Sequence, residues 1–173
     1  FEAHVGHPTR TIAWGHSLGG IITAGLVQRN PERFDGALPM CGVLGGGVGP
    51  WNTALDSAFA FKTLIAPTAG LDVVNIANPQ ANIQAALQAL TAAQGTAEGR
   101  ARIALISAFA GGPGWFTAAT PEPAATDYAA REQNQYLWAR NVTFPFAFML
   151  RAELEQRAGG NPSWNTGVNY RLL

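Results

Sequence analysis

Hydrophobic and polar positions follow one pattern up to about residue 50 and a different one after it. Before that point, short β-branched and apolar runs at residues 10–14 and 35–41 have the composition of buried strands. Between them, residues 20–30 place apolar side chains at helical spacing, and Asn30 precedes a proline, which ends a helix. This order of strand, helix and strand predicts a right-handed crossover that joins two parallel strands.

From Trp51 onward the apolar spacing is helical throughout. A capping box, Thr53-x-x-Asp56, predicts the start of a helix that ends before Pro67. Further helices are expected at residues 79–94, 98–110, 127–142 and 144–158, and a new segment at Trp164. Pairs at i,i+4 spacing, Glu98 with Arg102 and Glu153 with Arg157, support two of these helices. The pattern therefore predicts a strand-containing part, residues 1–50, and a helical part, residues 51–173.

The junction between the first predicted strand and its helix carries a G-x-S-x-G motif, in the run Trp14-Gly15-His16-Ser17-Leu18-Gly19-Gly20. A serine at the tip of such a sharp strand-to-helix turn holds a strained backbone and an exposed hydroxyl. The residues two before and two after it crowd together, so we expect glycine to be required at Gly15 and Gly19. The alternative interpretation is a structural glycine turn.

Composition narrows the possible partners. Charged residues make up 13% of the 173 residues, against about 25% in a typical protein, which suggests that other polypeptide covers part of the surface. The net charge of zero gives no electrostatic case for nucleic acid or an anionic membrane. No run approaches the roughly 18 apolar residues of a membrane span. The lone cysteine, Cys41, is expected to be buried and offers no thiolate metal site.

Two features suggest that the fold extends beyond this chain. Residues 1–6 read as the last turn of a helix that ends at Gly6, so we expect polypeptide upstream. A sheet of two parallel strands also lacks the neighbours and the cover on both faces that parallel strands need.

The motif and its surroundings resemble the α/β-hydrolase superfamily, in particular secreted bacterial serine esterases and lipases. The resemblance rests on residues 12–21 and on the following Asn30-Pro31-Glu32-Arg33-Phe34-Asp35-Gly36. It implies an α/β fold class: a partial α/β-hydrolase fold with parallel strands, a crossover helix and an α-helical cap, incomplete on its own. It also implies an extracellular location, and no cofactor or metal.

The resemblance also assigns roles to residues of the motif. Ser17 would be the nucleophile that forms an acyl-enzyme from a small carboxylic ester, and the backbone N–H of Leu18 would donate to the oxyanion. Gly15, His16 and Gly19 would set the geometry of the turn, with His16 beside the serine but not its base. In this fold the acid and the histidine follow the serine.

The three histidines, His4, His7 and His16, all precede Ser17, so none can take the general-base position of the family. We therefore expect other chains to supply the acid and the histidine, and this chain alone to be inactive. The alternatives are an inactive hydrolase-like fragment that serves as a binding or self-association module, and a peptidase or amidase in the complete protein. His4 and His7 are interpreted as solvated or capping side chains, because a metal site needs three or four ligands.

Four aromatic residues are candidates for an acyl or aromatic substrate pocket: Trp115, Phe116, Trp138 and Phe148. Aromatic side chains at helical spacing are also typical of an ordinary core, and this alternative stays open.

Overall fold

The computed structural model describes residues 2–163 of the chain. It divides into two compact units, residues 1–47 and residues 48–173, so the observed division lies three residues before the predicted boundary at residue 50. The segment from Trp164 onward, where a new element was expected, lies outside the described residues. Each unit has its own secondary structure and is described separately.

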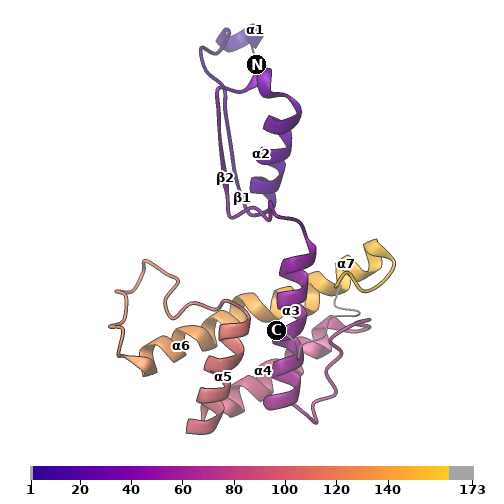
Figure 1. Cartoon of the computed structure of the whole chain (residues 1–173), viewed down its shortest axis with the longest axis vertical. Coiled ribbons are helices and arrows are strands. Elements are labelled where there is room, and N and C mark those ends of the chain that lie inside the picture. Colours follow the sequence, from indigo (N-terminus) through magenta and orange to yellow (C-terminus); the bar gives the residue numbers. More distant parts are fainter. Residues whose placement is uncertain (1, 164–173) are drawn as a thin grey trace, which may run out of the picture. The chain divides into compact units, whose positions relative to one another are not determined.

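The first unit contains one pair of parallel strands and the helix that connects them (Figure 1). Strand β1 (Ile12–His16) is followed by α2 (Leu18–Arg29), the short 3-10 turn η1 (Pro31–Arg33) and β2 (Gly36–Met40). The strands pair in parallel, with Ile12 opposite Gly36 and His16 opposite Met40. The predicted parallel pairing is confirmed, and a short helix α1 (Glu2–Val5) ends at Gly6 with φ 84°, as its glycine indicated.

Local hydrogen bonds fix both ends of this crossover. The N–H of Thr11 donates to Asp35 Oδ2 at 2.7 Å, and the N–H of Asp35 donates to the Thr11 carbonyl at 2.8 Å. At the end of α2, Asn30 donates from its side chain and from its backbone to the carbonyl of Leu26, each at 3.0 Å. Both bonds go to one carbonyl in the last turn of α2, before Pro31 begins the next turn.

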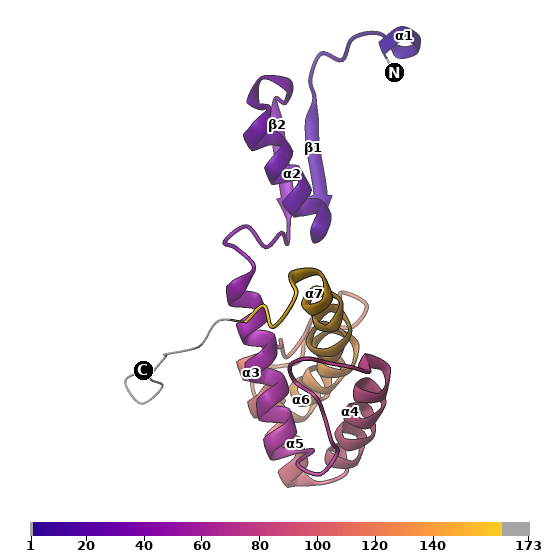
Figure 2. The same ribbon diagram turned by 90° about the vertical axis from the view of Figure 1, so that its right-hand side faces the viewer.

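Helix α2 covers only one face of the strand pair (Figure 2). An ideal Cβ on Gly15 would lie 2.9 Å from Thr23 Oγ1, so the face that includes Gly15 is the one against α2. The opposite face exposes Trp14, which keeps 70% of its surface accessible, and its register partner Leu38, which keeps 55%. Parallel sheets are normally covered on both faces, so this face is unusually apolar for a solvent surface.

The second unit is helical and has its own core. Its helices are α3 (Val48–Leu64), α4 (Pro79–Gln94), α5 (Ala97–Phe109) and a long helical stretch from Tyr128 to Ala158. Side-chain caps begin three of them: Asn78, Thr96 and Asp127 accept from the N–H three residues on, at 2.9–3.0 Å. The core is centred on Phe61, Phe144 and Phe148, with Phe61 and Phe144 edge to face at 4.7 Å.

Two helix boundaries differ from the prediction. Helix α3 begins at Val48, and Thr53 Oγ1 donates to the Gly49 carbonyl at 3.1 Å, so the capping box expected at Thr53 is wrong. The predicted pair of helices at 127–142 and 144–158 is one continuous stretch: α6 (Tyr128–Trp138), π-helical turns at 139–143 and 145–150, and α7 (Arg151–Ala158) (Figure 1). Pro145 has no N–H to donate, and the wider π turns carry the helix past it.

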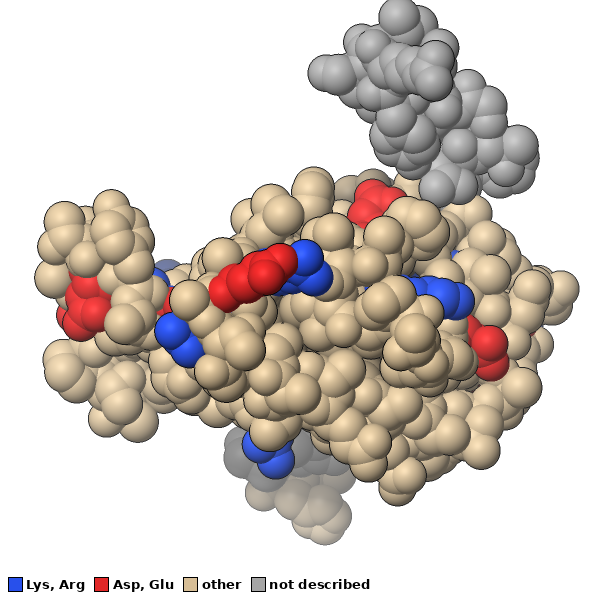
Figure 3. Space-filling model, turned by 90° about the horizontal axis from the view of Figure 1, so that it is seen from below, with Lys and Arg blue, Asp and Glu red and all other residues tan. Residues whose placement is uncertain are grey.

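The expected ion pairs at i,i+4 spacing are confirmed: Glu98 with Arg102, and Glu153 with Arg157 at 2.7 Å. Charged side chains are few on the face drawn in Figure 3, and broad uncharged areas separate them. None of the helices within residues 2–163 is long and apolar enough to cross a membrane.

A buried ion pair ties together distant segments of the second unit. Arg151 is fully buried, and its Nε donates to Glu155 Oε1 at 3.1 Å. Its Nη1 donates to Ser163 Oγ at 3.0 Å and to the Trp51 carbonyl at 3.3 Å. The other oxygen of Glu155 accepts from the N–H of Ile76 at 2.9 Å. Burial lowers the pKa of Arg151, and the nearby Glu155 carboxylate raises it.

Candidate functional site

Ser17 lies alone between β1 and α2, in a backbone conformation that serine rarely adopts. Its φ is 55° and its ψ is −117°. A non-glycine residue at positive φ costs about 1–3 kcal/mol and persists only where the surroundings hold it in place. Its side chain makes no capping hydrogen bond to α2, and the residue is exposed. The hydroxyl is therefore presented outward at the strand-to-helix turn.

Backbone hydrogen bonds hold this conformation from both sides. The N–H of Ser17 donates to the carbonyl of Met40 at 2.9 Å, which attaches the turn to the end of β2. The carbonyl of Ser17 accepts from Gly20 at 2.9 Å and from Ile21 at 3.2 Å, which starts the helix. Ser17 is thus fixed by β2 and α2 together, and the strain is compensated by three bonds that need this turn.

The glycines around Ser17 are not equivalent. A Cβ on Gly15 would lie 2.5 Å from the Gly19 carbonyl carbon, and a Cβ on Gly20 would lie 2.6 Å from the Met40 carbonyl oxygen. Nothing lies within 4 Å of a Cβ built on Gly19. The expectation that Gly19 must be glycine to leave space is therefore wrong. The close approaches are made by Gly15 and Gly20 instead. Gly15 meets the backbone of Gly19, so a side chain on Gly19 itself would not clash with it.

The start of α2 places backbone donors beside the serine. Leu18 is the first helical residue, and the first N–H groups of a helix have no partner within it. The helix N-terminus also carries partial positive charge, so it favours a developing oxyanion. His16 ends β1 and is exposed, and no hydrogen bond joins it to the Ser17 hydroxyl within the described part of the chain.

Cys41, which follows the end of β2, differs from the prediction. It is exposed, not buried, and has φ 51°. It directly follows Met40, whose carbonyl binds Ser17, so the chain must turn sharply there. Within residues 2–163 no group of three His, Cys, Asp or Glu side chains is placed to hold a metal ion.

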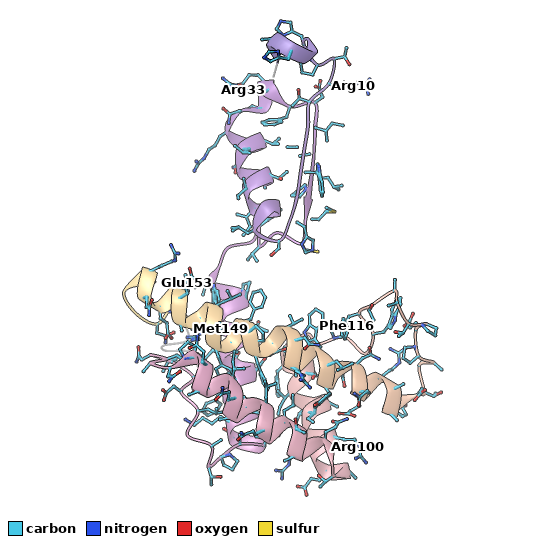
Figure 4. The ribbon with its side chains drawn as sticks, turned by 180° about the vertical axis from the view of Figure 1, so that it is seen from behind. Arg10, Arg33, Arg100, Phe116, Met149 and Glu153 are labelled. Atoms are coloured by element: carbon cyan, nitrogen blue, oxygen red, sulfur yellow. The ribbon has the colours of Figure 1, made fainter. Side chains whose placement is uncertain are left out.

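The four candidate aromatic residues lie in the second unit in two different settings. Phe116 and Trp138 pack edge to face at 5.3 Å, where the loop before α6 returns to the helix (Figure 4). Trp115 is in the same loop, and its Nε1 donates to the Thr120 carbonyl at 2.9 Å. Phe148 is fully buried against Phe144 in the core, so its ring offers no accessible surface.

Sequence reasoning missed two features that the structure brings together. One is the close approach of Gly20 to the Met40 carbonyl, which the position of Gly20 directly after Gly19 in the motif could have suggested. The other is a cleft between α5 and α6, lined by Arg100, Arg131 and Glu132 among other residues. Nothing in the sequence marks it, because its residues are separated along the chain and lie on two helices.

Comparison with known proteins gives one curated relative. The chain is 28% identical to an o-phthalyl amidase from Xanthobacter agilis over an alignment of 193 positions, which covers 98% of this chain. The chain spans 42% of the length of that relative. No protein-family model and no solved structure matches the chain.

Proposed function

We propose that this chain carries the nucleophile of a serine hydrolase and that Ser17 is that nucleophile. The observation that carries the proposal is the strained backbone of an exposed serine, held between β1 and α2 by bonds to Met40, Gly20 and Ile21. Strain of this kind is common at catalytic sites, where the surrounding structure maintains it. The likeness to an amidase, itself a hydrolase, supports the same class of reaction.

In the proposed reaction, Ser17 Oγ forms a bond to the carbonyl carbon of the substrate while its proton passes to a base. The N–H of Leu18 donates to the oxyanion that develops on the carbonyl oxygen. The carbon–nitrogen or carbon–oxygen bond then breaks, and the leaving amine or alcohol takes up the proton. Water hydrolyses the acyl-serine and releases the acid.

The base and its acid partner would come from polypeptide outside this chain. All three histidines precede Ser17 in the sequence, whereas the resembled fold places its histidine after the nucleophile. The exposed face of β1 and β2, with Trp14 and Leu38, is the surface that a further helix would cover, while further strands would pair at the edges of the sheet. On this proposal the second unit would be the cap of the complete enzyme.

We favour an amide over an ester as the substrate, which revises the expectation from the sequence. The curated relative is named for amide hydrolysis of an o-phthalyl group. An amide of this type joins a carboxylate-bearing benzene ring to an amine through a carbonyl carbon that Ser17 could attack. The substrate class is thus a small aromatic amide.

A fluorophosphonate probe tests the nucleophile, applied to the chain together with the polypeptide that completes its sheet. Labelling is expected on Ser17, absent in Ser17→Ala and retained in Ser107→Ala, whose hydroxyl is buried in α5. Labelling that persists in Ser17→Ala would refute the role of this residue. An unlabelled protein that self-associates would instead favour the binding-module alternative, which the exposed apolar strand face also suits.

A further inference from the structure

The second unit has a cleft of about 560 Å³ between α5 and α6. This volume is typical of sites for small organic molecules. Its apolar wall is formed by Ala101, Ala104 and Ala129, and Tyr128, which is exposed, also lines it. The alanines give a shallow apolar surface that an aromatic ring can cover.

The two arginines of the cleft, Arg100 and Arg131, differ in the hydrogen bonds and ion pairs that they make. Arg131 donates from Nε to the Ala124 carbonyl at 3.0 Å, and from Nη2 to Pro123 and Glu122 at 2.7 and 3.2 Å. Its charge is therefore balanced by Glu122, and its role is to hold the loop before α6. Arg100, on the first turn of α5 (Figure 4), makes one side-chain hydrogen bond, from Nη1 to the Gln94 carbonyl at 3.1 Å. The remaining donors of Arg100 meet no acceptor among the described residues.

Glu132 is the acidic residue of the cleft, and its charge is disfavoured. It is 8% exposed, and its Oε2 accepts from Gln94 Nε2 at 3.0 Å. Glu132 Oε1 and Gln94 Oε1 are both buried without a donor. Burial raises the pKa of Glu132, although the Gln94 bond and the Arg100 charge act in the opposite direction. A proton on Glu132 would also create a donor where two buried oxygens have none.

These contacts leave donors of the Arg100 guanidinium free to bind a ligand in the cleft. Arg131 is paired with Glu122, whereas no ion pair joins Arg100 to a carboxylate among the described residues. A cationic ligand would be repelled by the Arg100 guanidinium. An organic anion would instead find a forked donor at one end of the cleft and an apolar wall beside it.

We propose that the α5–α6 cleft binds a small aromatic carboxylate, with its carboxylate on the Arg100 guanidinium and its ring over the alanine wall beside Tyr128. The identity of the ligand rests on the proposed function. Hydrolysis of an o-phthalyl amide releases an aromatic dicarboxylate, and the cleft would bind this product.

Calorimetric titration of the full chain with phthalate tests the site, with benzylamine, a cation of similar size, as the opposite-charge probe. Phthalate is expected to bind saturably and more tightly than benzylamine. Arg100→Gln should weaken phthalate binding at least tenfold, and Arg100→Lys should weaken it less. Glu132→Gln, which keeps the shape and removes the charge, should bind phthalate at least as tightly as the unmodified chain. Arg157→Gln, an exposed arginine paired on α7, is the matched control and should leave the affinity unchanged.

Three results would overturn the proposal: no saturable binding of phthalate, tighter binding of benzylamine, or equal losses in the Arg100 and Arg157 variants. The test measures binding without turnover, so it separates the cleft from the nucleophile. Phthalate binding with an unlabelled Ser17 would refute the proposed function and leave the cleft intact. A labelled Ser17 without phthalate binding would refute the cleft alone.

Discussion

Alanine at Gly15 and alanine at Gly19 are expected to have opposite effects, although both glycines belong to one motif. A Cβ on Gly15 would meet the Gly19 carbonyl carbon at 2.5 Å and Thr23 Oγ1 at 2.9 Å. These atoms belong to the first turns of α2, and the Gly19 backbone cannot rotate away, so α2 must move from β1. Overpacking of this kind costs about 1–3 kcal/mol. A Cβ on Gly19 meets nothing within 4 Å, and alanine there should gain about 0.4–1 kcal/mol by restricting the unfolded chain.

Hydrogen exchange of the first unit measures the difference in stability between the Gly15→Ala and Gly19→Ala variants at the strand-to-helix turn itself. The amide hydrogens of Ser17, bonded to Met40, and of Ile21, bonded to Ser17, report on the turn directly. Since about 1.4 kcal/mol corresponds to a factor of ten, Gly15→Ala should speed their exchange by roughly fivefold to a hundredfold. Gly19→Ala should leave exchange unchanged or slow it. Equal acceleration in the two variants would refute the close approach of α2 to β1 at Gly15.

Three further predictions concern the second unit. Arg151→Met should lower the free energy of unfolding of this unit by about 3–5 kcal/mol, because Glu155 would be left as an unpaired buried charge. In chemical denaturation, the double variant with Glu155→Leu should recover most of this loss. No recovery would show that the pair matters only for packing. The pKa of Glu132 is raised in the folded chain above its unfolded value of 4.5. The Glu132 side chain therefore contributes most to the free energy of unfolding below pH 4.5, and this contribution is lost as the pH rises through the folded pKa. The unfolding free energy of Glu132→Gln relative to the unmodified chain should therefore increase from acid to neutral pH, and a constant difference would contradict the shift. Residues 48–173 expressed alone should unfold cooperatively by circular dichroism, since they contain their own core, whereas residues 1–47 should not.

Much of the first unit could be predicted because its signals are local. β-branched residues before Ser17, glycines around it and a proline after Asn30 each restrict the backbone within a few residues. The strand and helix on either side of Ser17 and their parallel partner were found in this way. Helix α4 was predicted to the residue from the helical spacing of Ile83, Leu87 and Leu90 after Pro79, and the structure shows Asn78 as its cap.

The sequence-based predictions failed where contacts between distant residues or details of the backbone determine the structure. A Cβ on Gly15 would meet α2, and a Cβ on Gly20 would meet the end of β2 at Met40. Neither contact can be known from the spacing within G-x-S-x-G alone. Helix α3 extends back to Val48 through residues that read as a loop. The buried bond between Ile76 and Glu155 spans 79 residues, and the periodicity of either segment gives no sign of it.

The most direct test of the central claim is to trap the acyl-enzyme. The chain, completed by the polypeptide that supplies its base, would be mixed with a phthalyl amide, quenched in acid and digested with trypsin. Cleavage after Arg10 and Arg29 gives the peptide 11–29, in which Ser17 is the single serine. We predict that this peptide gains the mass of the acyl group and that fragmentation places it on Ser17. Turnover that continues in Ser17→Ala, or an acyl group trapped on another residue, would contradict the account.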